Sequence, residues 1–128
     1  MPDFEPYLES VVERGVLVLT ILRKQIEGED LAVVLKDELA AAVKKHGIHK
    51  VVLDLGRCHY VSSIAFWPLL ALRRQLADAS GKLLITGLNG AVHEVFTSTK
   101  MVSSTGSLDA PFEMAPDRET AVSRLADS

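Results

Sequence analysis

Several features that mark common protein classes are scarce in this chain of 128 residues. It contains one cysteine, Cys58, so no disulfide can form within the chain. Its 14 Lys and Arg residues are outnumbered by 17 Asp and Glu residues, which gives a net charge of −3. Nucleic-acid binding is therefore not expected, because contacts to phosphates need clustered basic side chains.

Long hydrophobic runs and targeting signals are also lacking. The longest uncharged apolar stretches are residues 16–22 and 64–72, well short of the ~20 residues that span a bilayer. The first five residues include Asp3 and Glu5 and no basic residue, whereas a secretory signal begins with positive charge. We therefore expect a cytoplasmic protein without membrane attachment, and at this length a single domain over residues 1–128.

Catalytic motifs are mostly absent, and the one zinc-like spacing, at His46 and His49, spans a predicted helix end and strand start, which separates the two rings. The residues around Ser62 and Ser63 do not form Gly-x-Ser-x-Gly, which a hydrolase needs to expose its nucleophile. Cys58 and His59 are adjacent, and adjacent residues of an extended chain point in opposite directions. We expect no catalytic residue, no metal and no cofactor. The alternative, an enzyme that uses Ser63 or Cys58 as a nucleophile, has no general base at a convincing spacing.

Apolar periodicity predicts alternating strands and helices. The predicted strands are Leu8–Glu13 and residues 16–22 as a hairpin, residues 49–55, residues 82–88, and a short edge strand at residues 111–114. Four helices are predicted. The first has Asp30 as its N-cap and ends at Gly47, and the second covers residues 64–79. The third begins at Asn89-Gly90, and the fourth has Asp117 as its N-cap. Residues 97–110 are predicted to be a loop. Inward-facing residues are predicted to include Val34, Leu70 and Ala79.

This order of elements predicts an α/β fold. We expect an open mixed sheet of four to five strands, largely parallel, with about four helices. A strand, a helix and another strand form a right-handed parallel unit. The segment Ser62-Ser63 then lies beyond the carboxyl ends of the strands, which is the usual functional edge of such sheets.

Ser62 and Ser63 permit two interpretations that are compatible with each other. A serine hydroxyl at a helix start can accept a hydrogen bond from a backbone N–H two or three residues further on. A serine at the same place can also carry a phosphate, because a helix N-terminus stabilises an anion.

Several segments resemble the STAS domains of anti-sigma-factor antagonists. Residues 51–55, Val-Val-Leu-Asp-Leu, resemble the central strand of the family. The resemblance implies that Asp54, in this strand, is a structural residue near the site. Residues 58–70 resemble the stretch that contains Asp-Ser-Ser-Gly in the family, and residues 81–88 and 92–99 resemble later family segments. The order and spacing of these segments carry the resemblance, which covers about residues 10–126.

The resemblance implies a regulator without catalytic activity. Typical family members bind a serine kinase that is also an anti-sigma factor. Phosphorylation of the first Ser of Asp-Ser-Ser-Gly inactivates them, and a serine phosphatase restores them. That serine corresponds to Ser63, with Ser62 as the alternative phosphorylation site. The resemblance implies a STAS-like sheet and a monomer or a weak dimer.

The chain departs from the family motif at four positions. Ser62 replaces the Asp, Ile64 the second Ser, Ala65 the Gly, and Trp67 a small residue. Loss of the carboxylate favours a second hypothesis, a STAS scaffold that binds partners without phosphorylation. A transporter-associated STAS domain is a third hypothesis, which the lack of a membrane segment disfavours.

Trp67 and Arg74 are further candidates for partner binding, together with Ser62 and Ser63. Trp67 and Arg74 lie on the face of the predicted helix opposite its apolar stripe, and an aromatic residue beside the functional edge can anchor a partner. The alternative is that Trp67 packs against residues 97–110.

Overall fold

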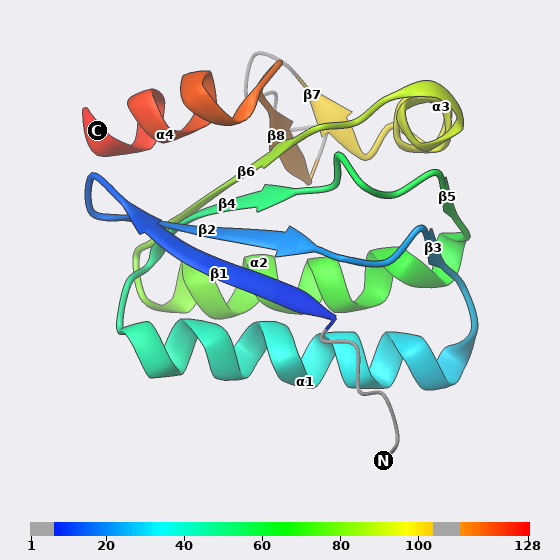
Figure 1. Cartoon of the computed structure of the whole chain (residues 1–128), viewed down its shortest axis with the longest axis horizontal. Coiled ribbons are helices and arrows are strands. Elements are labelled where there is room, and N and C mark those ends of the chain that lie inside the picture. Colours follow the sequence, from blue (N-terminus) through cyan, green and yellow to red (C-terminus); the bar gives the residue numbers. More distant parts are fainter. Residues whose placement is uncertain (1–6, 104–110) are drawn as a thin grey trace.

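One sheet with the strand order β1-β2-β4-β6-β8-β7 organises the computed structural model, which describes residues 7–103 and 111–128 (Figure 1). Its strands are β1 (Leu8–Glu13), β2 (Val16–Ile21), β4 (Lys50–Asp54), β6 (Lys82–Thr86), β8 (Phe112–Met114) and β7 (Val102–Ser103). β1 and β2 pair antiparallel, and all other neighbours in this sheet pair parallel.

The predicted α/β class and the largely parallel sheet are confirmed, and the described residues contain one more sheet strand than we expected. The additional strand is β7, inside the segment predicted to be a loop. The predicted strand at residues 111–114 is confirmed as β8, but β7 pairs with its outer side, so its predicted edge position was wrong. Residues 104–110 of the predicted loop lie outside the described residues.

The helices cover both faces of the sheet (Figure 1). α1 (Glu29–His46) and α2 (Phe66–Asp78) lie side by side on one face, and α4 (Arg118–Ala126) lies on the other. α3 (Gly90–Ser98) lies at the end of the sheet, beside a second, two-stranded sheet of β3 (Gln25–Ile26) and β5 (Tyr60–Val61).

Strand β2 shows why two layers of helices are needed. All six of its residues are buried, as the sequence predicted, and successive side chains of a strand point to opposite faces. Leu17, Leu19 and Ile21 join the core under α1 and α2, whereas Val16 and Val18 join the core under α4. A strand that is apolar on both faces is stable only where both faces are covered.

Helix α1 ends as predicted and begins earlier than predicted. Gly47 adopts a left-handed conformation with φ 64°, and its N–H donates to the Val43 carbonyl at 2.9 Å, a common way to end a helix. The N-cap is Gly28, not Asp30. Asp30 lies instead in the first turn, where its negative charge interacts favourably with the helix dipole.

The inner faces of α1 and α2 differ from the prediction at three residues. Leu35, Leu39 and Val43 are buried, but Val34 is exposed and Ala32 takes the inner position. Leu70 and Ala79 of the second predicted helix are also exposed. Val34 and Leu70 lie to one side of a narrower buried stripe, whereas Ala79 follows the last residue of α2 as its C-cap.

Asp117 caps α4, as predicted. Its Oδ1 accepts a hydrogen bond from the Thr120 N–H at 2.8 Å, and this bond lowers the pKa of the Asp117 carboxyl. The cap holds a helix that buries Ala121, Val122 and Leu125 against the sheet.

We expect Asp117→Ala to lower the urea midpoint of unfolding by more than Glu119→Ala, which removes a negative charge from the same turn without removing a cap. The pKa of Asp117 is lower in the folded protein, so its stabilisation is present above the unfolded-state pKa of about 3.9 and is lost as the pH falls further. The difference between the two variants should therefore shrink between neutral pH and about pH 3. Urea titrations at both pH values measure this, and a difference that is independent of pH would contradict it.

Candidate functional site

Ser62 and Ser63 lie where the short strand β5 passes into a helix. Ser63 begins the 3-10 turn η1 (Ser63–Ala65), which continues directly into α2. In Figure 1 this junction lies at the same end of the molecule as the carboxyl ends of β2 and β4 and the start of α1. The structure therefore places both serines at the edge of the sheet that the sequence indicated.

The backbone before Ser63 is held by the neighbouring segment 24–26. The Lys24 carbonyl accepts hydrogen bonds from the N–H groups of His59 at 2.7 Å and Tyr60 at 3.2 Å. Ser62 N–H donates to the Ile26 carbonyl at 2.9 Å. Nothing in the amino-acid pattern signals this pairing, because strands of two residues carry no periodicity.

The two serine side chains have different environments. The Ser62 side chain is partly buried, and its Oγ lies 3.5 Å from the Ile26 carbonyl oxygen, to which it donates. Ser62 occupies the residue before η1 with extended backbone, but its side chain makes no capping hydrogen bond. The capping interpretation was therefore wrong, since this hydroxyl points to Ile26. Ser63 is exposed, so its hydroxyl is accessible from solvent.

Asp54 braces the chain at the end of β4. Its Oδ1 accepts a hydrogen bond from Gly56 N–H at 2.8 Å. Gly87, with φ 79°, lies so close that a Cβ there would be 2.5 Å from Gly56 N and 2.6 Å from Asp54 Oδ1. The turn after β4 and the turn after β6 thus pack on each other through a carboxylate and two glycines.

Trp67 is 45% exposed and lies one helical turn beyond Ser63. Lys36 of α1 places its Nζ 5.5 Å from the centre of the Trp67 ring, within the range of a cation–π interaction. Sequence reasoning did not find Lys36, because nothing in the sequence shows that residues 36 and 67 meet across two helices. Arg74 is exposed and lies two turns along α2 on the same face as Trp67. The alternative prediction was that Trp67 packs against residues 97–110, and residues 104–110 of that segment lie outside the described residues.

Cys58 is buried and His59 beside it is exposed, so the two side chains diverge. Burial, and secondarily the negative charge of Asp54, raises the pKa of the Cys58 thiol to about 12. A thiolate is the reactive form of cysteine, so this thiol is unsuited to act as a nucleophile. In the parts of the chain that the structure describes, no cluster of three metal-ligand residues occurs and no helix is long and apolar enough to cross a membrane.

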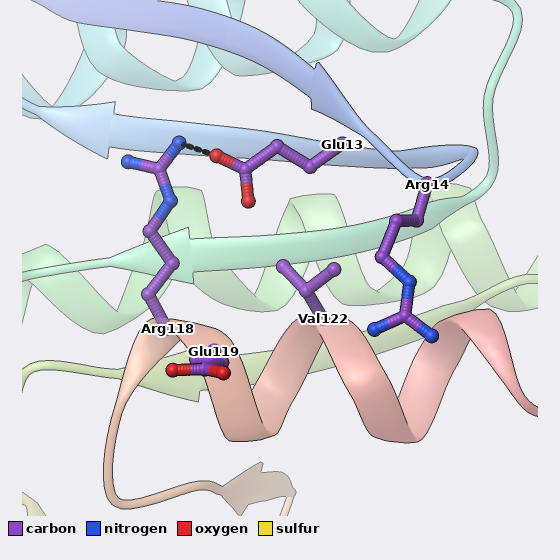
Figure 2. Close-up of a pocket in the computed structure, with 5 residues that line it drawn as sticks. All are labelled: Glu13, Arg14, Arg118, Glu119 and Val122. Carbon is purple, nitrogen blue, oxygen red and sulfur yellow. Dashed lines mark hydrogen bonds and ion pairs between the residues drawn. The ribbon is translucent and has the colours of Figure 1, made fainter.

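A separate pocket of about 350 Å³ lies between the β1–β2 turn and α4. Figure 2 shows Arg118 and Val122 of α4 facing Glu13 and Arg14 of the hairpin, with Glu119 at the side. The carboxylate of Glu13 accepts a hydrogen bond from Arg118, and Arg14 donates to Ser123 Oγ at 3.0 Å. These contacts join the hairpin to α4, and they lie at the opposite end of the sheet from β5 and the start of α2 (Figure 1).

The family model described as "Mlab, STAS domain" matches residues 28–103, which include β4, the two serines and α2. The chain belongs to the STAS-domain family. The match begins at the N-cap of α1 and ends with β7. It therefore includes α1, β4, β5 and α2 around Ser62 and Ser63, whereas β2 and β3 precede it.

Individual relatives of this STAS domain are anti-sigma factor antagonists. The chain is 39% identical over 87 residues to BtrV of Bordetella bronchiseptica, described as an anti-sigma factor antagonist, and the match covers 68% of each chain. An anti-sigma factor antagonist of Thermotoga maritima shares the fold, with a TM-score of 0.74 at 14% identity over 92% of this chain and 93% of that one.

The Bacillus cell fate determinant SpoIIAA, solved in its phosphorylated form, also shares the fold. Its TM-score is 0.63 at 14% identity, and the match covers 91% of this chain and 97% of SpoIIAA. The family match over residues 28–103 and the relative BtrV confirm the family assignment implied by the resemblance. This chain is a STAS domain of the anti-sigma-factor-antagonist type, a class of signalling proteins that act through other proteins.

We expect Gly87→Ala to destabilise the fold by about 2–4 kcal/mol, because it combines backbone strain with a clash against Gly56 and Asp54. Gly15→Ala is the matched control, since Gly15 has φ 78° and a Cβ there would have no atom within 4 Å. It should cost only about 1 kcal/mol. Urea denaturation of both variants measures the difference, and equal losses would show that the close packing of the two turns contributes nothing.

We expect the Cys58 thiol to react with a disulfide reagent at about pH 8 only after unfolding, because its pKa is far above that pH in the folded protein. Labelling with and without denaturant, followed by absorbance, tests this. Labelling of the folded protein at the rate of a free thiol would contradict the burial and the raised pKa of Cys58.

Proposed function

We propose that this STAS domain binds a serine-kinase anti-sigma factor through the surface around Ser62 and Ser63, and that phosphorylation of Ser63 releases it. A serine phosphatase then restores binding. The observation that carries the proposal is the exposed Ser63 hydroxyl at the start of the η1–α2 helix, on a backbone held by β3. On this proposal the protein acts in the cytoplasm and has no catalytic residue of its own.

The position of Ser63 suits a phosphate that changes binding without unfolding the protein. A phosphate adds roughly −1.5 to −2 charge at neutral pH, and the N-terminal end of a helix favours negative charge. The same charge weakens docking of a partner that has desolvated this surface. The phosphorylated form of SpoIIAA, which shares the fold, supports a modification of this kind.

The surface beside Ser63 supplies an anchor for the partner. The exposed Trp67 indole and the half-buried Lys36 lie together across α1 and α2, and exposed Arg74 continues this surface along α2. Aromatic and arginine side chains contribute most to protein–protein affinity. We infer that Trp67 and Arg74 contact the partner together with the two serines.

A second function rests on Ser62, which replaces the acidic residue of the family motif. Its hydroxyl is directed to the Ile26 carbonyl, so this position presents no carboxylate to a kinase. This favours a scaffold that binds its partner in one state only, with no phosphorylation.

Incubation with the cognate serine kinase and ATP, followed by mass spectrometry, tests the phosphorylation site. We expect a single phosphate on Ser63 that is lost in Ser63→Ala and kept in Ser62→Ala. Phosphate on Ser62 alone would move the site by one residue, and no phosphate under conditions in which the kinase binds would favour the scaffold.

We expect Ser63→Asp to weaken partner binding by at least about tenfold, and Trp67→Ala and Arg74→Ala to weaken it by about tenfold each. Arg73→Ala is the matched control, since Arg73 is the adjacent exposed arginine of α2. It is rotated by about 100° around the helix axis from Arg74 and so does not share the face of Trp67. Titration calorimetry measures the partner affinity of these four variants and of Ser63→Ala. Equal affinity of wild type, Ser63→Ala and Ser63→Asp would support the scaffold.

A further inference from the structure

The outer side of β1 has no partner strand among the described residues. Leu22 N–H donates to the Tyr7 carbonyl at 2.8 Å, so residues 7 and 22 form a hydrogen-bonded pair of the hairpin. Such pairs alternate along antiparallel strands, and the register continues with Glu9 opposite Thr20 and Val11 opposite Val18. The residues between them, Leu8, Ser10 and Val12, therefore direct their backbone N–H and C=O groups away from the sheet.

The two edges of the sheet differ in how they limit pairing. β7, at one edge, is two residues long. β1, at the other, is six residues long and contains no proline and no lysine, which are the residues that most often protect an edge. Val11 and Val12 are 37% and 47% exposed, so β1 also presents apolar side chains on both of its faces.

We propose that β1 pairs antiparallel with β1 of a second copy of this chain, about a two-fold axis at Ser10. Residues that lie opposite each other in two antiparallel strands point to the same face of the joined sheet. Because side chains alternate between the faces and both strands have the same sequence, the two residue numbers of each opposite pair must add up to an even number, which is the same for every pair. A sum of 20 places Leu8 opposite Val12 and Ser10 opposite its own copy. This register pairs every outward N–H and C=O group of Leu8, Ser10 and Val12.

Charge selects this register over the next possible one. A sum of 22 would place Glu9 directly opposite Glu13 of the second copy, and like charges in that position are destabilising. A sum of 20 places Glu9 opposite Val11. Glu13 is directed toward Arg118 of α4 (Figure 2), so its charge is compensated within its own chain.

The space beside β1 admits a second strand. A groove of about 330 Å³ runs between β1 and α1 and is lined by Leu8, Ser10, Ala41 and Ala42, with Glu38 and Lys45 among its charged residues. The small alanine side chains leave the α1 side of β1 open, and one acidic and one basic residue give the groove no excess of either charge. This surface is distinct from the Ser63 surface, so dimerisation through β1 is independent of the proposed function.

Sedimentation equilibrium from about 10 µM to about 1 mM tests the association. We expect a reversible dimer whose dissociation constant rises at least about tenfold in Ser10→Pro, because the N–H that proline removes is an outward one and the hairpin keeps its own bonds. Val12→Lys should weaken the dimer as well, whereas Val33→Lys, at an exposed valine of α1, should not. A wild type that stays monomeric, or a dimer unchanged in Ser10→Pro and Val12→Lys, would overturn the proposal.

Oxidative cross-linking tests the register and does not depend on how Ser10→Pro folds. Cys58 is the one native cysteine and is buried, so a new surface thiol reports alone. Ser10→Cys should give a disulfide-linked dimer on a non-reducing gel, since opposite Cα atoms of a hydrogen-bonded pair lie ~5.5 Å apart. Val12→Cys should not, because its copy lies four residues further along the strand. Cross-linking of Val12→Cys and not of Ser10→Cys would exclude the axis at Ser10.

Discussion

The burial of β2, β4 and β6 on both faces is the constraint on which the rest of this fold depends. Strands of this kind need a helical layer above and below, and parallel neighbours need crossover connections that return outside the sheet. α1 and α2 serve both needs on one face, and α4 closes the other. The connections that follow the parallel strands consequently meet at one end, where Ser62 and Ser63 lie.

The sequence predicted those features that depend on apolar periodicity or on local chemistry. The run 16–22 indicated a strand buried on both faces, and Asp117 and Gly47 marked helix ends through their own hydrogen-bonding and backbone preferences. It did not predict β3, β5 and β7, because strands of two residues form where neighbouring segments hold them and not from their own propensity.

The sequence predicted the position of the candidate site but not the contacts of its side chains. Strand order alone places Ser62 and Ser63 at the carboxyl end of the sheet. The direction of the Ser62 hydroxyl depends on Ile26, which is 36 residues away, and the environment of Trp67 depends on Lys36 of another helix. Contacts of this range leave no trace in the spacing of residues along one chain, so only the folded arrangement reveals them.

The length of the β3–β5 ladder has a consequence for motion at the site. Two residue pairs and a few flanking hydrogen bonds join the backbone before Ser63 to its neighbour, whereas five pairs join β4 to β6. The buried side chains of Cys58 and Val61 also anchor this segment in the core. Opening the short ladder breaks few hydrogen bonds and leaves the large sheet intact, so its cost lies mainly in exposing these buried side chains and is less than that of global unfolding. The segment that carries the two serines can therefore separate from its neighbour as a small local unit, while the body of the molecule remains folded.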